Sequence, residues 1–140
     1  LERSAPAIEM SDPSAAQIRH AVTSIGAGQV PGTALQDLEI GASEAVSNAR
    51  RHGRPPVTAR IWAASGRILV HVHDTGPGPD DPLAGLVPAW TRPELDGAGL
   101  WLIHMLDLDT AMIRSPDGYT IRLAASSPSQ HRGHSGHPAR

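Results

Sequence analysis

Lysine, cysteine and phenylalanine are absent from this chain of 140 residues, and the first two absences exclude whole classes of chemistry. Every basic residue is arginine, so the chain cannot carry a P-loop lysine, the strand lysine of a eukaryotic-type protein kinase or a Schiff-base lysine. Without cysteine it has no disulfide, no thiol nucleophile and no cysteine-bound zinc. Asparagine occurs once, as Asn48, which makes the position of that residue informative.

Charge and hydropathy indicate one small globular domain. The chain has 12 basic and 14 acidic residues and a formal net charge of -2, which gives no electrostatic signature of nucleic-acid or membrane-surface binding. No apolar run approaches the roughly 18 residues of a transmembrane helix, and no signal peptide is visible. We therefore expect a cytoplasmic protein with no nucleic-acid or membrane partner. The chain begins at Leu1, so we expect a fragment or a processed form.

Composition along the chain predicts three regions. Residues 1–10 form an irregular N-terminal segment in which Ile8–Met10 is a short strand, and residues 11–125 form the folded domain. Residues 126–140 are rich in Ser, Pro, Gly, His and Arg and are predicted to be a disordered tail.

Apolar spacings of three and four predict two amphipathic helices. The first runs from Asp12 to Ala27, with Asp12 as its N-cap. The second begins near Thr33, where Thr33 and Gln36 have the spacing of a capping box, and ends at His52.

Alternating and helical patterns predict the rest of the domain. Strands are expected at 57–64, 67–74, 110–114 and 119–124, with a lid at 75–96 and a third helix at 97–106. This order predicts an α+β two-layer sandwich, with a mainly antiparallel mixed sheet and about three helices on one face.

The second helix carries a polar stripe as well as an apolar one. Glu44, Asn48 and His52 are four residues apart, so they share one face of the helix. Asparagine is a poor residue for a helix interior. On the helix alone, a solvated polar face is still the more common explanation.

Two glycine-containing turns follow. Asp74 ends an apolar strand and precedes Gly76 and Gly78, and a carboxylate at such a strand end can accept a hydrogen bond from a ligand NH group. Gly97 and Gly99 lead into an apolar helix whose first NH groups could bind an anion. Taken separately, each pattern is most often only a turn or a helix start.

Together, the order and spacing of these motifs resemble the Bergerat-fold ATPases, the superfamily that includes the ATP-binding domains of gyrases and histidine kinases. Residues 44–53 resemble the N box, and residues 74–78 and 97–100 resemble the first and second glycine boxes. The resemblance covers about residues 10–124. It is strongest to anti-sigma-factor serine/threonine kinases and to histidine-kinase-like ATP-binding regulators.

This resemblance implies ATP and Mg²⁺ as cofactors and assigns roles by position. Asn48 would ligate Mg²⁺, Glu44 would be the general base, and Asp74 would accept a hydrogen bond from the adenine amino group. The remaining nucleotide-binding positions would be His52, Gly76, Gly78, Gly97, Gly99, Leu100 and Thr120, with Thr120 supporting the adenine contact through water. The serine kinases often carry an arginine two residues before the second glycine box. Leu95 occupies that position here, and Arg92 is the nearest candidate for a phosphate contact.

The resemblance leaves three functions open. The first is a slow or partner-dependent serine/threonine kinase that binds a sigma factor or its antagonist and phosphorylates the antagonist. The second is the isolated ATP-binding domain of a larger sensor kinase or transcriptional regulator. The third is a protein-binding module with a vestigial nucleotide site. A homodimer is an open alternative.

Histidines provide one further alternative. His71 and His73 share a strand face, and His131, His134 and His137 lie in the tail. A metal site is therefore one alternative, and a strand that faces solvent or a partner is the other. His20 lacks the residues that surround a phosphoacceptor histidine, so autophosphorylation within this chain is not expected.

Overall fold

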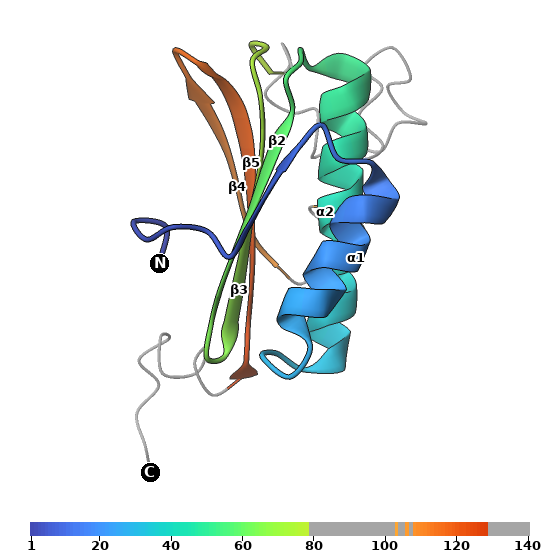
Figure 1. The fold of residues 1–140 in the computed structure, drawn as a ribbon, viewed down its shortest axis with the longest axis vertical. Helices are drawn as coiled ribbons and strands as arrows, with labels where there is room; N and C mark the ends of the chain where they lie inside the picture. The colour runs from blue at the N-terminus through green and yellow to red at the C-terminus, as the bar shows by residue number, and fades with distance from the viewer. Residues whose placement is uncertain (79–102, 104–105, 107, 129–140) are drawn as a thin grey trace.

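The protein folds into two layers, with helices packed on one face of a β-sheet (Figure 1). The computed structural model describes residues 1–78, 103, 106 and 108–128. Its elements are β1 (Ile8–Ser11), α1 (Ala15–Gly26), α2 (Gly32–His52), β2 (Thr58–Ala64), β3 (Arg67–Asp74), β4 (Asp109–Ser115) and β5 (Gly118–Ser126). The predicted α+β sandwich is confirmed.

The sheet has five strands in the order β1-β2-β3-β5-β4. All four pairings between these strands are antiparallel. The mainly antiparallel character is therefore confirmed, whereas the described strands include none of the parallel pairings that a mixed sheet requires. Two helices lie in the described part of the chain. The third helix predicted at 97–106 lies outside it except for residues 103 and 106, and the predicted lid lies outside it from residue 79 onward.

The N-cap of α1 differs from the prediction. Ser14 caps the helix, because its Oγ accepts a hydrogen bond from Gln17 N at 3.0 Å while Ser14 N donates to Gln17 Oε1 at 2.9 Å. Asp12 lies before the helix with a φ of 49°. Its Oδ1 accepts from Val57 N at 2.9 Å, so Asp12 ties the helix entry to the chain just before β2.

The start of α2 also differs from the prediction. The helix begins at Gly32 after Pro31, and no side chain caps it, so the capping box expected from Thr33 and Gln36 is wrong. Thr33 already lies inside the first turn of α2, whereas an N-cap residue must precede the first turn. The predicted end is confirmed, since α2 stops at His52 and Gly53 N donates to Ala49 O at 3.0 Å.

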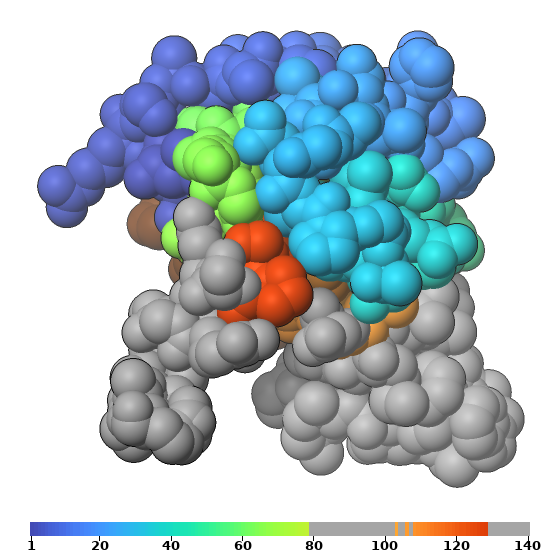
Figure 2. Space-filling view, turned by 90° about the horizontal axis from the view of Figure 1, so that it is seen from below, coloured from blue at the N-terminus to red at the C-terminus, as the bar shows by residue number. Residues whose placement is uncertain are grey.

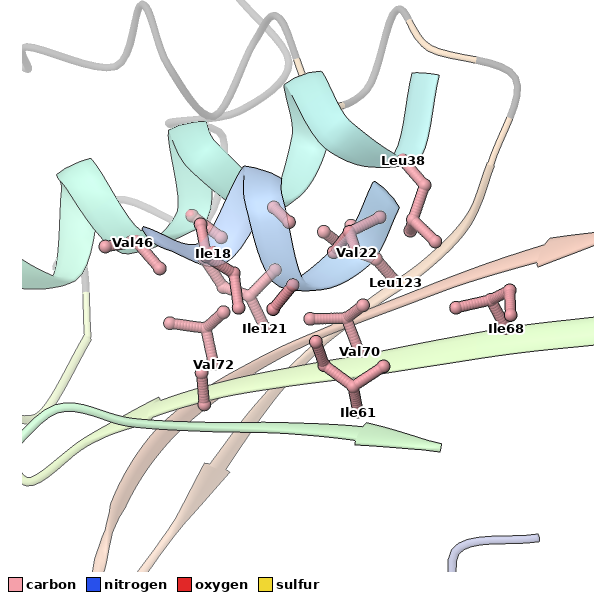
Figure 3. Packing of buried hydrophobic residues seen from close by; sticks show 14 of the residues in the cluster. Ile18, Val22, Leu38, Val46, Ile61, Ile68, Val70, Val72, Ile121 and Leu123 are labelled. Atoms are coloured by element: carbon pink, nitrogen blue, oxygen red, sulfur yellow. The ribbon is translucent and has the colours of Figure 1, made fainter. Parts of the chain in front are cut away.

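The hydrophobic core lies between the helices and the sheet (Figure 3). Ile68, Val70 and Val72 of β3 point into it. They contact Ile18 and Val22 of α1. At one end of the domain, the start of α2 packs close to the end of β5, near the β2–β3 turn (Figure 2). Each large aliphatic side chain buried here contributes about 1.5–3 kcal/mol.

The first and last strands of the sheet extend beyond the domain boundaries that were expected after residues 10 and 125. β1 pairs with β2 from Ile8 onward, so the expected boundary after residue 10 falls within a strand. β5 continues to Ser126, while residues 129–140 of the predicted tail lie outside the described part of the chain. Of the helices that the structure describes, none has the length and apolar character needed to cross a bilayer.

Candidate functional site

The polar stripe of α2 is most deeply buried at its middle residue, Asn48. Glu44 is half-buried, Asn48 is only 7% exposed and His52 is exposed. Within the described part of the chain, Asn48 Nδ2 is buried and has no hydrogen-bond partner. An unpaired buried amide costs about 1–3 kcal/mol. Asn48 therefore does not have the environment of an ordinary solvated helix face.

Asp74 is a buried carboxylate at the end of β3. It is 4% exposed, and its Oδ1 accepts hydrogen bonds from Gly76 N at 2.7 Å and Arg54 N at 3.3 Å. Backbone NH groups from both sides of the carboxylate thus fix its orientation. Both hydrogen bonds that the described residues make to this carboxylate go to Oδ1.

Gly53 brings the end of α2 directly against Asp74. A Cβ at Gly53 would lie 2.4 Å from Asp74 Cγ, so either the backbone or the Asp74 side chain would have to shift to admit it. Thr75 fixes the two segments, since its N donates to Arg54 O at 2.9 Å and its Oγ1 donates to Arg54 O at 3.1 Å. Asn48 is five residues before Gly53, about 7.5 Å along the helix axis. The α2 stripe and Asp74 therefore lie at the same edge of the domain.

Gly76 and Gly78 allow the chain to pass close to this edge. A Cβ at Gly76 would lie 3.0 Å from Asp74 Oδ1. Gly78 has a φ of +80°, and a Cβ there would lie 2.4 Å from the ring of Tyr119. Gly76 therefore lies directly against Asp74, and Gly78 lies against Tyr119. Their roles in nucleotide binding stay predictions.

Tyr119, rather than Thr120, lies on the same face of the sheet as Asp74. Tyr119 is opposite Asp74 in the β3–β5 register and is buried in the core cluster. Burial raises the pKa of its hydroxyl, and the charge of Asp74 raises it further, while Arg114 acts in the opposite direction.

Thr120 points to the opposite face, where its Oγ1 and His73 Nδ1 are 2.8 Å apart. The expectation that Thr120 supports an adenine contact beside Asp74 is therefore wrong. Alternation along β5 could have shown this, because Ile121 and Leu123 face the core and Tyr119 shares their parity.

The second glycine box cannot be placed. Gly97, Gly99 and Leu100 lie outside the described residues, as do Leu95 and Arg92. The residues that the structure does describe contain no group of three or more His, Asp or Glu side chains arranged to hold a metal ion. A histidine metal site on β3 therefore gains no support from them.

The chain is similar to histidine kinases. It is 29% identical over 101 residues to the signal transduction histidine-protein kinase AfsQ2 of Streptomyces coelicolor, an alignment that covers 61% of this chain and 19% of that protein. The chain therefore spans less than a fifth of this relative.

Solved structures show the same fold. The histidine kinase domain of a blue-light activated histidine kinase from Erythrobacter litoralis matches with a TM-score of 0.52 and 20% identity, covering 85% of this chain and 61% of that domain. A second structure of the blue-light activated kinase matches with a TM-score of 0.51 and 18% identity, covering 85% and 43% of the two chains. Residues 9–125 match the family described as the histidine kinase-like ATPase domain, and the chain belongs to that family.

Proposed function

We propose that this chain binds ATP with Mg²⁺ at the edge where α2 meets the end of β3. The observation that carries the proposal is the buried Asp74 carboxylate, which two backbone NH groups hold against the end of the helix that bears Asn48. Membership of the ATPase-domain family supports the same site. Asp74 would accept a hydrogen bond from the adenine amino group, and Asn48 and Glu44 would face the phosphates.

The donor set of the α2 stripe fits a hydrated Mg²⁺ ion. Mg²⁺ takes oxygen ligands and keeps several waters, and Asn48 offers one amide oxygen from a buried position. Its Nδ2 has no partner among the described residues, so it would be available to donate to a phosphate oxygen. When bound, Mg²⁺ would neutralise charge on the phosphate oxygens. Glu44, one turn earlier on the same face, would accept the proton of an attacking hydroxyl group.

Discrimination between ATP and GTP tests this proposal directly. Guanine carries a carbonyl where adenine carries the amino group, so GTP would place an acceptor against the Asp74 carboxylate. A site built to hydrogen-bond one group rejects an analogue that leaves it unpaired. Calorimetric titration in excess Mg²⁺ is expected to give an affinity for ATP at least about tenfold above that for GTP. Equal affinities, or no binding of either nucleotide, would overturn the proposal.

We further propose that the nucleotide site regulates or phosphorylates a separate protein. The anti-sigma kinase hypothesis names a sigma factor or its antagonist as that protein, with a Ser or Thr as the acceptor. It rests on the N-box resemblance alone. The sensor-kinase alternative is favoured by the similarity to AfsQ2, whose printed name describes a histidine-protein kinase.

The acid stability of the phosphoryl product distinguishes these candidates. The chain would be incubated with ATP labelled at the γ-phosphate and with a candidate sigma-factor antagonist encoded beside its gene. Acid-stable label on the antagonist is expected for Ser or Thr transfer, and acid-labile label on a histidine would favour the sensor-kinase alternative. ATP binding without any transfer would favour a regulatory domain, and the absence of ATP binding would favour a vestigial site.

A further inference from the structure

The sheet face opposite the helices, which we call the open face, carries basic but no acidic side chains on its three inner strands. Strand alternation places Arg60 of β2, Arg67, His71 and His73 of β3, and Arg122 of β5 on this face. No acidic residue occupies an open-face position on β2, β3 or β5. The inner strands therefore form a basic surface, although the chain as a whole has a formal net charge of -2. Glu9 of β1 borders this surface and pairs with Arg60 at 2.6 Å.

Residues 1–7, which we call the strap, provide an acidic group to this surface. Figure 1 shows them on the side of the sheet away from α1 and α2. Glu2 Oε2 lies 2.6 Å from His71 Nε2 and 3.1 Å from Arg122 Nε, and its Oε1 accepts from Arg122 Nη2 at 3.3 Å. His71 and Arg122 are cross-strand partners. They therefore form a preformed receptor for one carboxylate.

Few contacts hold the strap. Every residue from 1 to 7 except Pro6 is exposed. Besides Glu2, the described contacts with the sheet are the hydrogen bonds from Trp62 Nε1 to Ser4 O at 2.9 Å and from Ala7 N to Ile61 O at 2.8 Å. Ion pairs at this level of exposure contribute little, typically about 0–1 kcal/mol. A competing carboxylate could therefore replace Glu2 on His71 and Arg122 at low cost in ion pairing, while Ser4 keeps its hydrogen bond to Trp62, which is buried with Leu69 and Ala124 on this face.

The open face also has room beside the strap. A hollow of ≈ 270 Å³ adjoins His71 and extends along His73 and Thr120 toward Asp117. Asp117, at the rim, is bonded to Ser115, and hydroxyl and imidazole groups form most of the lining. These groups can donate hydrogen bonds to further carboxylates of the same segment.

We infer that the open face is a docking surface for an acidic segment of a partner protein, one carboxylate of which replaces Glu2 on His71 and Arg122. The carboxylate bound by these two side chains favours a peptide over a nucleic acid. The nucleotide site is on the other face, around Asp74 and α2, so this inference is independent of the proposed function.

Titration with a short acidic peptide tests the inference. Tetraglutamate would be added to the isotopically labelled full chain at low salt, with NMR shifts followed residue by residue. Shifts are expected along β3 and β5 on the open face. Glu2→Gln should bind the peptide about two- to fivefold more tightly than wild type, because it removes the competing carboxylate. Arg122→Gln in the Glu2→Gln background should abolish the shifts.

Glu39→Gln is the matched control, because it removes the same charge from α2, where Glu39 is bonded to Thr23 of α1. It should bind the peptide as wild type does. Equal binding by the Glu2→Gln and Glu39→Gln variants, or equal shifts with tetraglutamine, would overturn the inference. Tighter binding of a single-stranded oligonucleotide would assign the face to nucleic acid, and dimerisation of Glu2→Gln would assign it to a second copy. Either result would contradict the acidic-peptide proposal.

Discussion

Asn48 is a buried side chain that we expect to contribute little to folding. Replacing it with Ala removes an amide whose Nδ2 is unpaired within the described residues and introduces a better helix former. We expect Asn48→Ala to keep its unfolding free energy within about 1 kcal/mol of wild type. The same variant should lose most of the Mg²⁺-dependent part of its ATP affinity, measured by titration with Mg²⁺ and with EDTA.

Leu38 on the same helix is the contrasting control. It is fully buried in the core, so Leu38→Ala should cost about 2–5 kcal/mol of stability and leave the Mg²⁺ dependence of any remaining folded protein unchanged. If Asn48→Ala destabilised the fold while Mg²⁺-dependent binding persisted, Asn48 would be a structural residue.

Glu44 should separate binding from turnover. A general base acts on the transition state more than on the bound ground state. Glu44→Ala should therefore abolish hydrolysis or transfer of the γ-phosphate while ATP affinity stays within a few-fold of wild type. Parallel loss of affinity and turnover would show that Glu44 maintains the site instead of activating an acceptor.

The junction between α2 and β3 depends on Gly53. Gly53→Ala would place a Cβ 2.4 Å from Asp74 Cγ and should lower the unfolding free energy by about 1–3 kcal/mol and weaken ATP binding. Gly32→Ala, at the start of the same helix with nothing within 4 Å of the new Cβ, should instead stabilise by about 0.4–1 kcal/mol. Denaturant unfolding measures both effects, and equal stability of the two variants would contradict this description of the junction.

The elements were more predictable from sequence than their ends. Periodicity predicted both described helices and the four strands after α2, because a residue spacing decides which side chains can be buried together. The caps were not predictable in this way. Asp12 and Thr33 have cap-forming side chains, yet Asp12 bonds to Val57, a residue 45 positions away, and a cap depends on such tertiary contacts.

The site shows the same division. Asp74 and Asn48 were identified from local spacing, and the structure buries both. The close packing of Gly53 against Asp74 could not be predicted, because it arises where the end of α2 meets the end of β3. No local sequence pattern contains that contact. Thr120 was assigned from a motif, whereas strand alternation places Tyr119 on the face of Asp74.

Protonation of His71 and Glu2 should lower the free energy of unfolding as the pH falls. Burial lowers the pKa of His71, and the hydrogen bond from Arg122 lowers the pKa of Glu2. A group whose pKa is lower in the folded than in the unfolded state stabilises the fold at every pH above its unfolded-state pKa. This stabilisation is lost as the pH falls through the folded-state pKa. The unfolded values are about 6.5 for His and 4.3 for Glu.

We therefore expect the denaturant concentration at the unfolding midpoint to decrease in two steps as the pH is lowered. The first step, at pH values below about 6.5, comes from protonation of His71, and the second, below about 4.3, comes from protonation of Glu2. His71→Gln should flatten the first decrease, and Glu2→Gln should flatten the second. A wild-type midpoint that stays constant from pH 7 to 4, or decreases that neither variant alters, would contradict this assignment.

The measurement that tests the nucleotide site most directly is the ATP affinity of Asp74→Asn. This change keeps an Oδ1 that can accept from Gly76 N and Arg54 N, so the fold should persist, while the second oxygen becomes an NH₂ donor that faces the adenine amino group. We predict a fall of roughly tenfold or more in ATP affinity, as one unpaired buried polar group costs about 1–3 kcal/mol. Asp109→Asn, at an exposed position of β4, removes the same charge and should bind ATP as wild type does. If both variants bind ATP as tightly as wild type, Asp74 does not recognise adenine and the nucleotide site is not where we place it.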